Sequence, residues 1–218
     1  MRFSRTRGVI YMVVAIVVVA IVAVWGGLVG LLVLRILARG ENAHHRSRTA
    51  ELSARDIPDY FDSTARFAVT ATARVRTAPE DAFIALADGR HLESIPFVAG
   101  STPIRARGQV GPVQVGEGRR IDTLVAALGE RIVRAEPGRI LVLTGTGVSI
   151  PMVLESFGER YTIDEIGDDL VDVSWTIAGT PRFIGFLPLR WAAPFLRPFL
   201  GFFLQRGLTR GSVEKVAG

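Results

Sequence analysis

Glu159 is the side chain whose type and position point most directly to chemistry in a buried site. It alternates with Phe157 and Tyr161 along an expected strand, so all three should point to the same inward face of a sheet. A charge on that face needs a partner or a ligand, and either Arg105 or Arg120 could supply the partner. A strand bulge that turns Glu159 outward is an equally supported alternative.

The three histidines offer little further chemistry. His91 could act as a general base at a cavity mouth, although a single histidine in a loop is more often simply solvated. His44 and His45 are adjacent, so they cannot easily chelate one metal ion, and no H-E-x-x-H motif supports them. With no G-x-S-x-G motif either, we expect no catalytic residue, metal ligand or cofactor.

The remaining carboxylate pairs are better explained as parts of a turn. Asp164-Glu165 and Asp168-Asp169 flank an expected hairpin tip, where acidic residues favour turns and solvent, so we reject an acid/base role. The chain has no cysteine, which excludes disulfides and cysteine-based metal sites.

Charge is concentrated at the start of the chain. Seven arginines and one acid precede position 49, and 19 bases and 20 acids follow it. The net charge of +5 therefore belongs to the N-terminal segment rather than to the folded part. A nucleic-acid-binding domain would carry the surplus itself, so we expect no nucleic-acid partner.

Residues 9–34 form an uncharged apolar run that predicts a transmembrane helix after a basic tail, residues 1–8. The run exceeds the roughly 20 residues that cross a hydrocarbon core. A cleaved signal peptide is the alternative, but its apolar region is usually only about 7–15 residues long and ends in a small-x-small site. Here the run ends at Leu34-Arg35-Ile36-Leu37, which favours a retained anchor in the cell membrane.

The arginines on either side of this helix bear on its orientation, and two glycines within it bear on its contacts. Arginines lie on both sides in nearly equal number, and the slight excess after the helix favours a cytoplasmic domain. Gly26 and Gly30 form a G-x-x-x-G motif, which would let two helices approach closely in a homodimer. The alternative is that glycine is simply common in membrane helices.

The chain after the helix has the pattern of one α+β domain. Residues 35–65 are polar and mixed and predict a linker, whereas residues 66–214 predict the domain. Period-two alternation is clearest at 67–76 and 170–177, and a helix begins near Pro79. A helix on one side of an antiparallel sheet is an α+β arrangement. The further expected strands are 103–107, 119–126, 129–135, 139–145 and 154–166, and a final helix spans 191–213.

The final helix is unusually rich in phenylalanine. Leu196, Phe199 and Phe203 share one expected face toward the sheet, and Phe195 and Phe202 form a neighbouring stripe. These side chains would form core and cavity wall. The alternative is that part of the stripe, with the interleaved arginines, touches an anionic membrane surface.

This order of elements resembles the START-like, or SRPBCC, helix-grip superfamily, and within it the polyketide cyclase/dehydrase and lipid-transport branch. The resemblance covers about residues 66–213, with Ile95-Pro96 standing where the family usually has Trp-Pro. The segments that carry it are Val75-Arg76-Thr77-Ala78-Pro79-Glu80-Asp81-Ala82-Phe83, Phe97-Val98, Gly118-Arg119-Arg120, Glu130-Arg131-Ile132, Glu136-Pro137-Gly138-Arg139-Ile140, Gly167-Asp168-Asp169 and Val173-Ser174-Trp175.

The resemblance implies a curved antiparallel sheet gripping the C-terminal helix, with an apolar cavity between them. The expected function is membrane-anchored binding of a hydrophobic small molecule or lipid. A cyclase/dehydratase-type enzyme acting in the same cavity is the first alternative, and a non-catalytic membrane scaffold is the second. The expected ligand-binding residues are Val69, Ala71, Phe97, Glu159, Tyr161, Val173, Trp175, Phe195 and Phe199.

Overall fold

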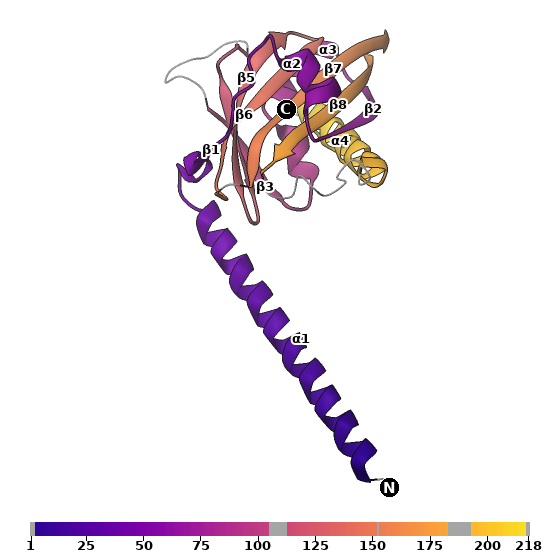
Figure 1. Ribbon diagram of the computed structural model, residues 1–218. Helices are drawn as coiled ribbons and strands as arrows, with labels where there is room; N and C mark the ends of the chain where they lie inside the picture. The colour runs from indigo at the N-terminus through magenta and orange to yellow at the C-terminus, as the bar shows by residue number, and fades with distance from the viewer. Residues whose placement is uncertain (1–2, 105–112, 152, 183–192, 217–218) are drawn as a thin grey trace.

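The helix α1 (Phe3–Ala38) projects away from the rest of the chain in the computed structural model, which describes residues 3–104, 113–151, 153–182 and 193–216 (Figure 1). Its segment Val18–Ala38 has a mean hydropathy of 2.3, and Ala38, at the end nearest the domain, is its only buried residue. This one N-terminal helix is therefore long and apolar enough to cross a membrane, as the sequence predicts.

The core of the domain is an antiparallel sheet in the order β2-β8-β7-β6-β5-β4-β3, with the short β1 beside β6. Consecutive strands from β3 to β8 are neighbours, so hairpin connections build most of the sheet. Asp169 has a positive φ of 52° in the turn between β7 and β8, which confirms the expected hairpin there. The strands are β1 (Ser47–Arg48), β2 (Phe67–Arg76), β3 (Val98–Ile104), β4 (Gly118–Thr123), β5 (Ala127–Glu136), β6 (Ile140–Val148), β7 (Leu154–Gly167) and β8 (Leu170–Pro181).

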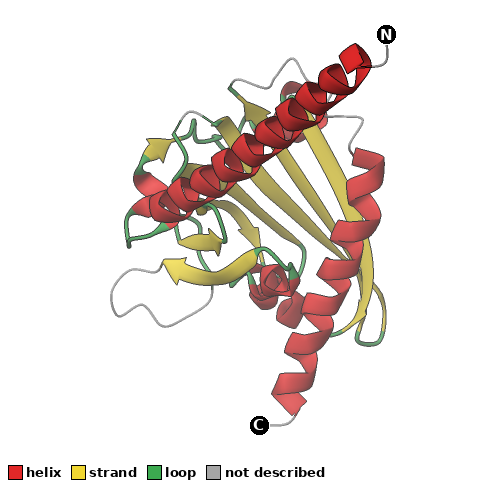
Figure 2. Cartoon of the chain, turned by 90° about the horizontal axis from the view of Figure 1, so that it is seen from below, coloured by secondary structure: helices red, strands yellow, loops and turns green. Residues whose placement is uncertain are grey.

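Three helical elements pack on one side of this sheet: α3 (Pro79–Ala87), η3 (Arg90–Ser94) and α4 (Ala193–Val216). Seen from below, α4 and α1 both lie in front of the strands (Figure 2). Leu204 and Leu208 of α4 are buried with strand residues in the main core. The expected fold class, an α+β helix grip behind an apolar helix, is thereby confirmed.

The face of α4 that meets the sheet differs in part from the expected one, because only Phe203 of the three expected residues is buried. Leu196 and Phe199 are exposed, whereas Phe203, Leu204 and Leu208 are buried. The helix has apolar residues on all of its sides, so their spacing alone did not predict which side faces the sheet. Gly207 fixes the packing, because a Cβ there would lie 2.4 Å from the Cα of His91 in η3.

Residues 43–65, which we expected to belong to a polar linker, pack against the sheet instead. The segment contains η1 (Ala43–His45), β1, α2 (Ile57–Asp59) and η2 (Tyr60–Thr64). Tyr60 and Phe61 are buried in a second core with Val142 and Ala178, on the face of the sheet opposite α4. Only a few residues after α1 therefore separate the helix from the packed domain.

Candidate functional site

The candidate site lies on the inner face of the sheet, where strand register brings polar side chains among apolar ones. Ala71 of β2 pairs with Trp175 of β8, which pairs with Tyr161 of β7. Glu159, two residues before Tyr161, pairs with Ile177 and therefore shares this face. The inward direction expected for Glu159 is confirmed, and its side chain is buried.

Arg119 of β4 is the centre of a buried ion-pair network. Its Nε donates to Glu130 Oε2 at 2.6 Å, and its Nη2 donates to a carboxylate oxygen of Glu159. Its Nη1 donates to the carbonyl oxygen of Leu86 at 2.7 Å, near the C-terminal end of α3, where a positive charge is favoured. One guanidinium therefore joins β4, β5, β7 and α3.

Tyr161 extends this network to η3. Its hydroxyl donates to Glu159 Oε2 at 2.5 Å and lies 2.9 Å from Nε2 of His91. The ring of Trp175 stacks near Tyr161, with a centroid distance of 5.9 Å, and meets the His91 ring edge-on at 5.2 Å. The result is a continuous polar path from His91 to Glu130 inside an apolar shell.

Among the described residues, Arg119 is the one cation paired with Glu130 and Glu159, so these three side chains carry one net negative charge when both carboxylates are ionised. Burial raises the pKa of Glu130 to about 7, although the nearby Arg119 opposes the rise. Burial also raises the pKa of Tyr161 well above its ordinary value and lowers that of His91 well below 6.5. Glu130 can therefore hold a proton near neutral pH, while His91 stays neutral.

The partner expected for Glu159 was wrong. Arg120 points to the other face, where its Nη2 lies 2.7 Å from Asp122 Oδ1, and the partner is its neighbour Arg119. Arg105, the other expected partner, lies outside the described residues. The alternation rule that places Glu159 inward also identifies Arg119, because Arg119 shares its face with the buried Ile121.

Glu130 is a further network residue that the sequence analysis did not single out. It sits two residues before the buried Ile132 in β5, so the same alternation could have identified it. His91 is buried rather than solvated, because α4 packs against η3 at Gly207. Sequence patterns do not reveal that contact between distant segments.

The other expected ligand-binding residues fall into two groups. Val69, Ala71, Val173 and Trp175 are buried on the inner face of β2 and β8. Three aromatic residues have exposed side chains in this structure instead: Phe97 (62% exposed), Phe195 (81%) and Phe199 (49%). The structure therefore places six of the nine residues together, counting Glu159 and Tyr161.

Within the described part of the chain, no group of three or more acidic, histidine or cysteine side chains could hold a metal ion. His44 is buried beside His45, and burial lowers its pKa. The inner face of the sheet thus combines buried apolar side chains with the fixed polar groups of Arg119, Glu130, Glu159 and Tyr161.

A curved antiparallel sheet with a long C-terminal helix is the architecture of a START-like helix-grip protein. The sequence profile described as "Polyketide cyclase / dehydrase and lipid transport" matches residues 66–210. The chain belongs to this family.

Several solved structures are similar to this chain at low sequence identity. A hypothetical protein, jhp0584, from Helicobacter pylori is 10% identical, with a TM-score of 0.53, covering 70% of this chain and 92% of that one. A START superfamily protein from Mycobacterium smegmatis is 16% identical, with a TM-score of 0.48, covering 68% and 98%. The Zhui aromatase/cyclase from Streptomyces sp. R1128 is 16% identical, with a TM-score of 0.43, covering 69% and 89%. Among curated proteins, no sequence matches this chain.

Proposed function

We propose that this protein is anchored in the cell membrane by α1 and holds a hydrophobic small molecule or lipid between the sheet and α4. The observation that carries the proposal is the buried network of Arg119, Glu159 and Tyr161 on an otherwise apolar inner face. Burial of an apolar ligand contributes about 25 cal/mol per Å² removed from water. A few fixed polar groups then orient the ligand.

Within the network, Glu159 is the carboxylate best placed to meet a ligand. Its side chain is 8% exposed, compared with 1% for Glu130 and 1% for Arg119. The hydroxyl of Tyr161 already donates to Glu159, so a polar ligand group would join an ordered hydrogen-bond chain. Val69 and Ala71 supply the neighbouring apolar wall on β2.

Native mass spectrometry of the full chain, extracted together with its own membrane, tests the binding proposal. We expect a hydrophobic molecule on the wild type and less of it on Glu159→Gln, which leaves Arg119 balanced by Glu130. Glu165→Gln, at an exposed position near the end of β7, is the matched control and should retain the molecule. A wild-type protein that carries only bulk lipid, or equal loss in both variants, would refute the proposal.

An enzyme of the cyclase or dehydratase type is the second candidate, and the pKa of Glu130 favours it. A carboxyl group with a pKa of about 7 can donate and accept a proton near neutral pH. Mass spectrometry of a hydrophobic β-hydroxy ketone incubated with the protein would detect loss of water. Turnover by the wild type that disappears in Glu130→Gln, with ligand retention unchanged, would favour the enzyme over the carrier.

A non-catalytic membrane scaffold is the third candidate. Trp175, Leu204 and Leu208 are almost fully buried and fill the interior beside the second half of α4. A scaffold would need no exchangeable ligand. The same mass spectrometry separates this candidate from the other two, because a scaffold would carry no specific molecule.

We also propose that the domain lies on the cytoplasmic side and that the Gly26 and Gly30 face of α1 can form a homodimer. A Cβ built on either glycine meets nothing within 4 Å, so this face is open for a second helix.

Because the chain has no cysteine, Asp168→Cys provides a single label at an exposed hairpin tip. An impermeant maleimide should label it only after cell lysis, and labelling of intact cells would reverse the orientation.

A further inference from the structure

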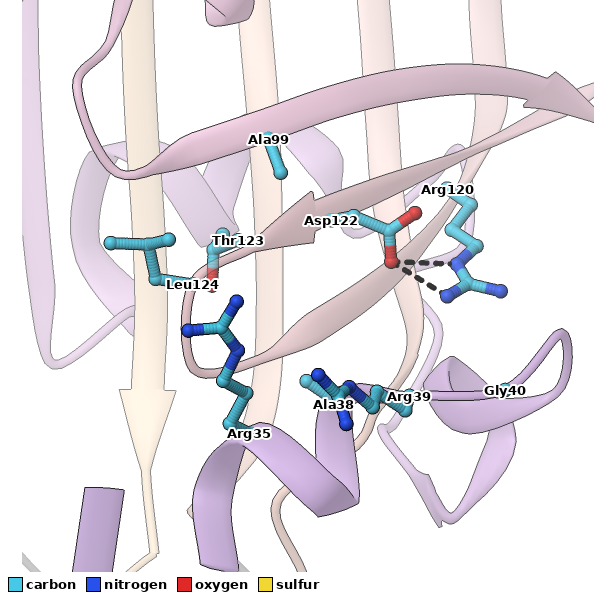
Figure 3. Close-up of a pocket in the computed structure, with 9 residues that line it drawn as sticks. All are labelled: Arg35, Ala38, Arg39, Gly40, Ala99, Arg120, Asp122, Thr123 and Leu124. Carbon is cyan, nitrogen blue, oxygen red and sulfur yellow. Dashed lines mark hydrogen bonds and ion pairs between the residues drawn. The ribbon is translucent and has the colours of Figure 1, made fainter. Parts of the chain in front are cut away.

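A hollow of about 330 Å³ lies where the end of α1 meets β3 and β4 (Figure 3). It is separate from the Arg119 network, because Arg120, which lines it, points to the opposite face of β4. Arg35 extends from α1 toward Thr123 and Leu124, and Arg39 lies below Asp122 in the same view. Three guanidinium groups and one carboxylate therefore surround this hollow.

The positive charge of this hollow is only partly neutralised. Arg120 is held by Asp122, with Nη2 at 2.7 Å from Oδ1, and its Nη1 donates to the carbonyl oxygen of Glu41 at 2.7 Å. Arg35 and Arg39 are exposed, and neither has an ion-pair partner in the described part of the chain. Among the described residues, no protein anion pairs with Arg35 or Arg39, so the hollow carries a surplus of two positive charges.

The hollow also lies at a defined depth along α1. The apolar run of this helix ends at Arg35, so a membrane that holds the run would place its headgroup layer beside Arg35 and Arg39. Phe97 and Leu124 are exposed next to it, joined by a hydrogen bond of 3.0 Å from Leu124 N to Phe97 O. Basic and apolar side chains at one level suit a charged headgroup with an acyl chain.

We propose that this hollow binds a phosphate group, supplied by the headgroup of an anionic lipid such as phosphatidylglycerol. Guanidinium groups match phosphate oxygens with paired hydrogen bonds, and the two surplus charges from Arg35 and Arg39 attract the anion. The inference rests on the proposed anchoring of α1 but not on a ligand between the sheet and α4. Bound headgroup would hold the domain at a fixed position on the membrane.

The test uses the full chain in nanodiscs of phosphatidylcholine mixed with phosphatidylglycerol, and native mass spectrometry of the lipids that remain bound. Two arginines at an anionic site correspond to about a 30-fold preference for the anionic lipid. We expect the wild type to retain phosphatidylglycerol in excess of its bulk fraction and R35Q/R39Q to lose that excess. The matched control is R66Q/R76Q, which removes one exposed arginine just before β2 and one at its end. This variant should keep the excess of phosphatidylglycerol.

Two further arms make the outcome decisive. In the first arm, inorganic phosphate is added to the protein in nanodiscs of phosphatidylcholine alone, to test whether free phosphate binds. If phosphate binds to the wild type but not to R35Q/R39Q, and the wild type shows no excess of phosphatidylglycerol, the hollow binds a soluble phosphate ester instead of a lipid. R35K/R39K, which keeps both charges, should retain part of the preference if R35Q/R39Q fails to insert. Membrane-integrated wild type with no preference for either phosphate source would overturn the proposal, whereas loss of the protein from the membrane would refute the anchoring instead.

Discussion

Replacement of Glu130 by glutamine tests the electrostatics of the buried network most sharply. The folded-state pKa of Glu130 is raised from 4.5 to about 7, so the folded protein binds more protons than the unfolded one between these values. The stability that this proton contributes is present below pH 4.5 and is lost as the pH rises through about 7. At about 1.4 kcal/mol per pKa unit, the loss amounts to about 3 kcal/mol.

Glu130→Gln keeps a hydrogen-bond acceptor for Arg119 Nε but cannot ionise. Its free energy of unfolding should therefore rise relative to the wild type by about 3 kcal/mol between about pH 4.5 and pH 8. For a domain of this size, that is a relative shift in melting temperature of about 6–12 °C. Urea denaturation of the full chain in detergent measures it, followed by tryptophan fluorescence, to which the buried Trp175 contributes.

The comparison isolates Glu130 because every other titrating group is present in both proteins. Glu165→Gln, at an exposed position, should show no such change with pH. If Arg119 instead keeps Glu130 ionised, Glu130→Gln would be destabilised by a similar amount at all these pH values. A difference that does not vary with pH would therefore refute the argument.

Three other predictions concern the same core. Arg119→Leu leaves two buried carboxylates without a cation and should lower the free energy of unfolding by about 3–5 kcal/mol in urea denaturation. Arg120→Leu, which removes a more exposed ion pair, should lower it by less than about 1 kcal/mol. Burial lowers the pKa of His91, so the folded protein favours the neutral imidazole, and the stability that this contributes is lost as the pH falls below 6.5. His91→Gln should therefore lose less stability on acidification than the wild type, as measured by melting temperatures over a series of pH values. Gly207→Ala places a Cβ 2.4 Å from the His91 backbone and should destabilise the protein by about 1–3 kcal/mol, whereas Gly201→Ala, whose nearest contact is 3.2 Å, should be close to neutral in thermal melting.

Strand alternation predicted much of the sheet because it follows from local geometry. The alternation of β2 and β8 identified their buried faces, and the acidic hairpin before β8 was predicted from its turn residues. The same rule placed Glu159 inward. The expected partner was wrong because the rule was not applied to β4, where Arg119 shares the inner face with the buried Ile121 and its neighbour Arg120 points the other way.

The features that the sequence did not reveal depend on contacts between distant segments. Tyr60 and Phe61 are buried because they pack against β6 and β8, and the polar residues around them have no helical or strand period. The rotation of α4 is set by Gly207 against His91, since phenylalanines occur on both faces of the helix. Arg35 and Arg39 surround a hollow only because β4 lies beside the end of α1.

Photo-crosslinking from the inner face of the sheet tests the central claim most directly. Ile177 lies between Val69 and Glu159 on that face, and Ser174 lies on the opposite face of the same strand. With a benzoylphenylalanine at position 177 of the full chain in its native membrane, we predict an adduct to a hydrophobic small molecule or lipid after illumination, and no such adduct from position 174. Crosslinks from position 177 that reach only the protein's own side chains would contradict a ligand held between the sheet and α4.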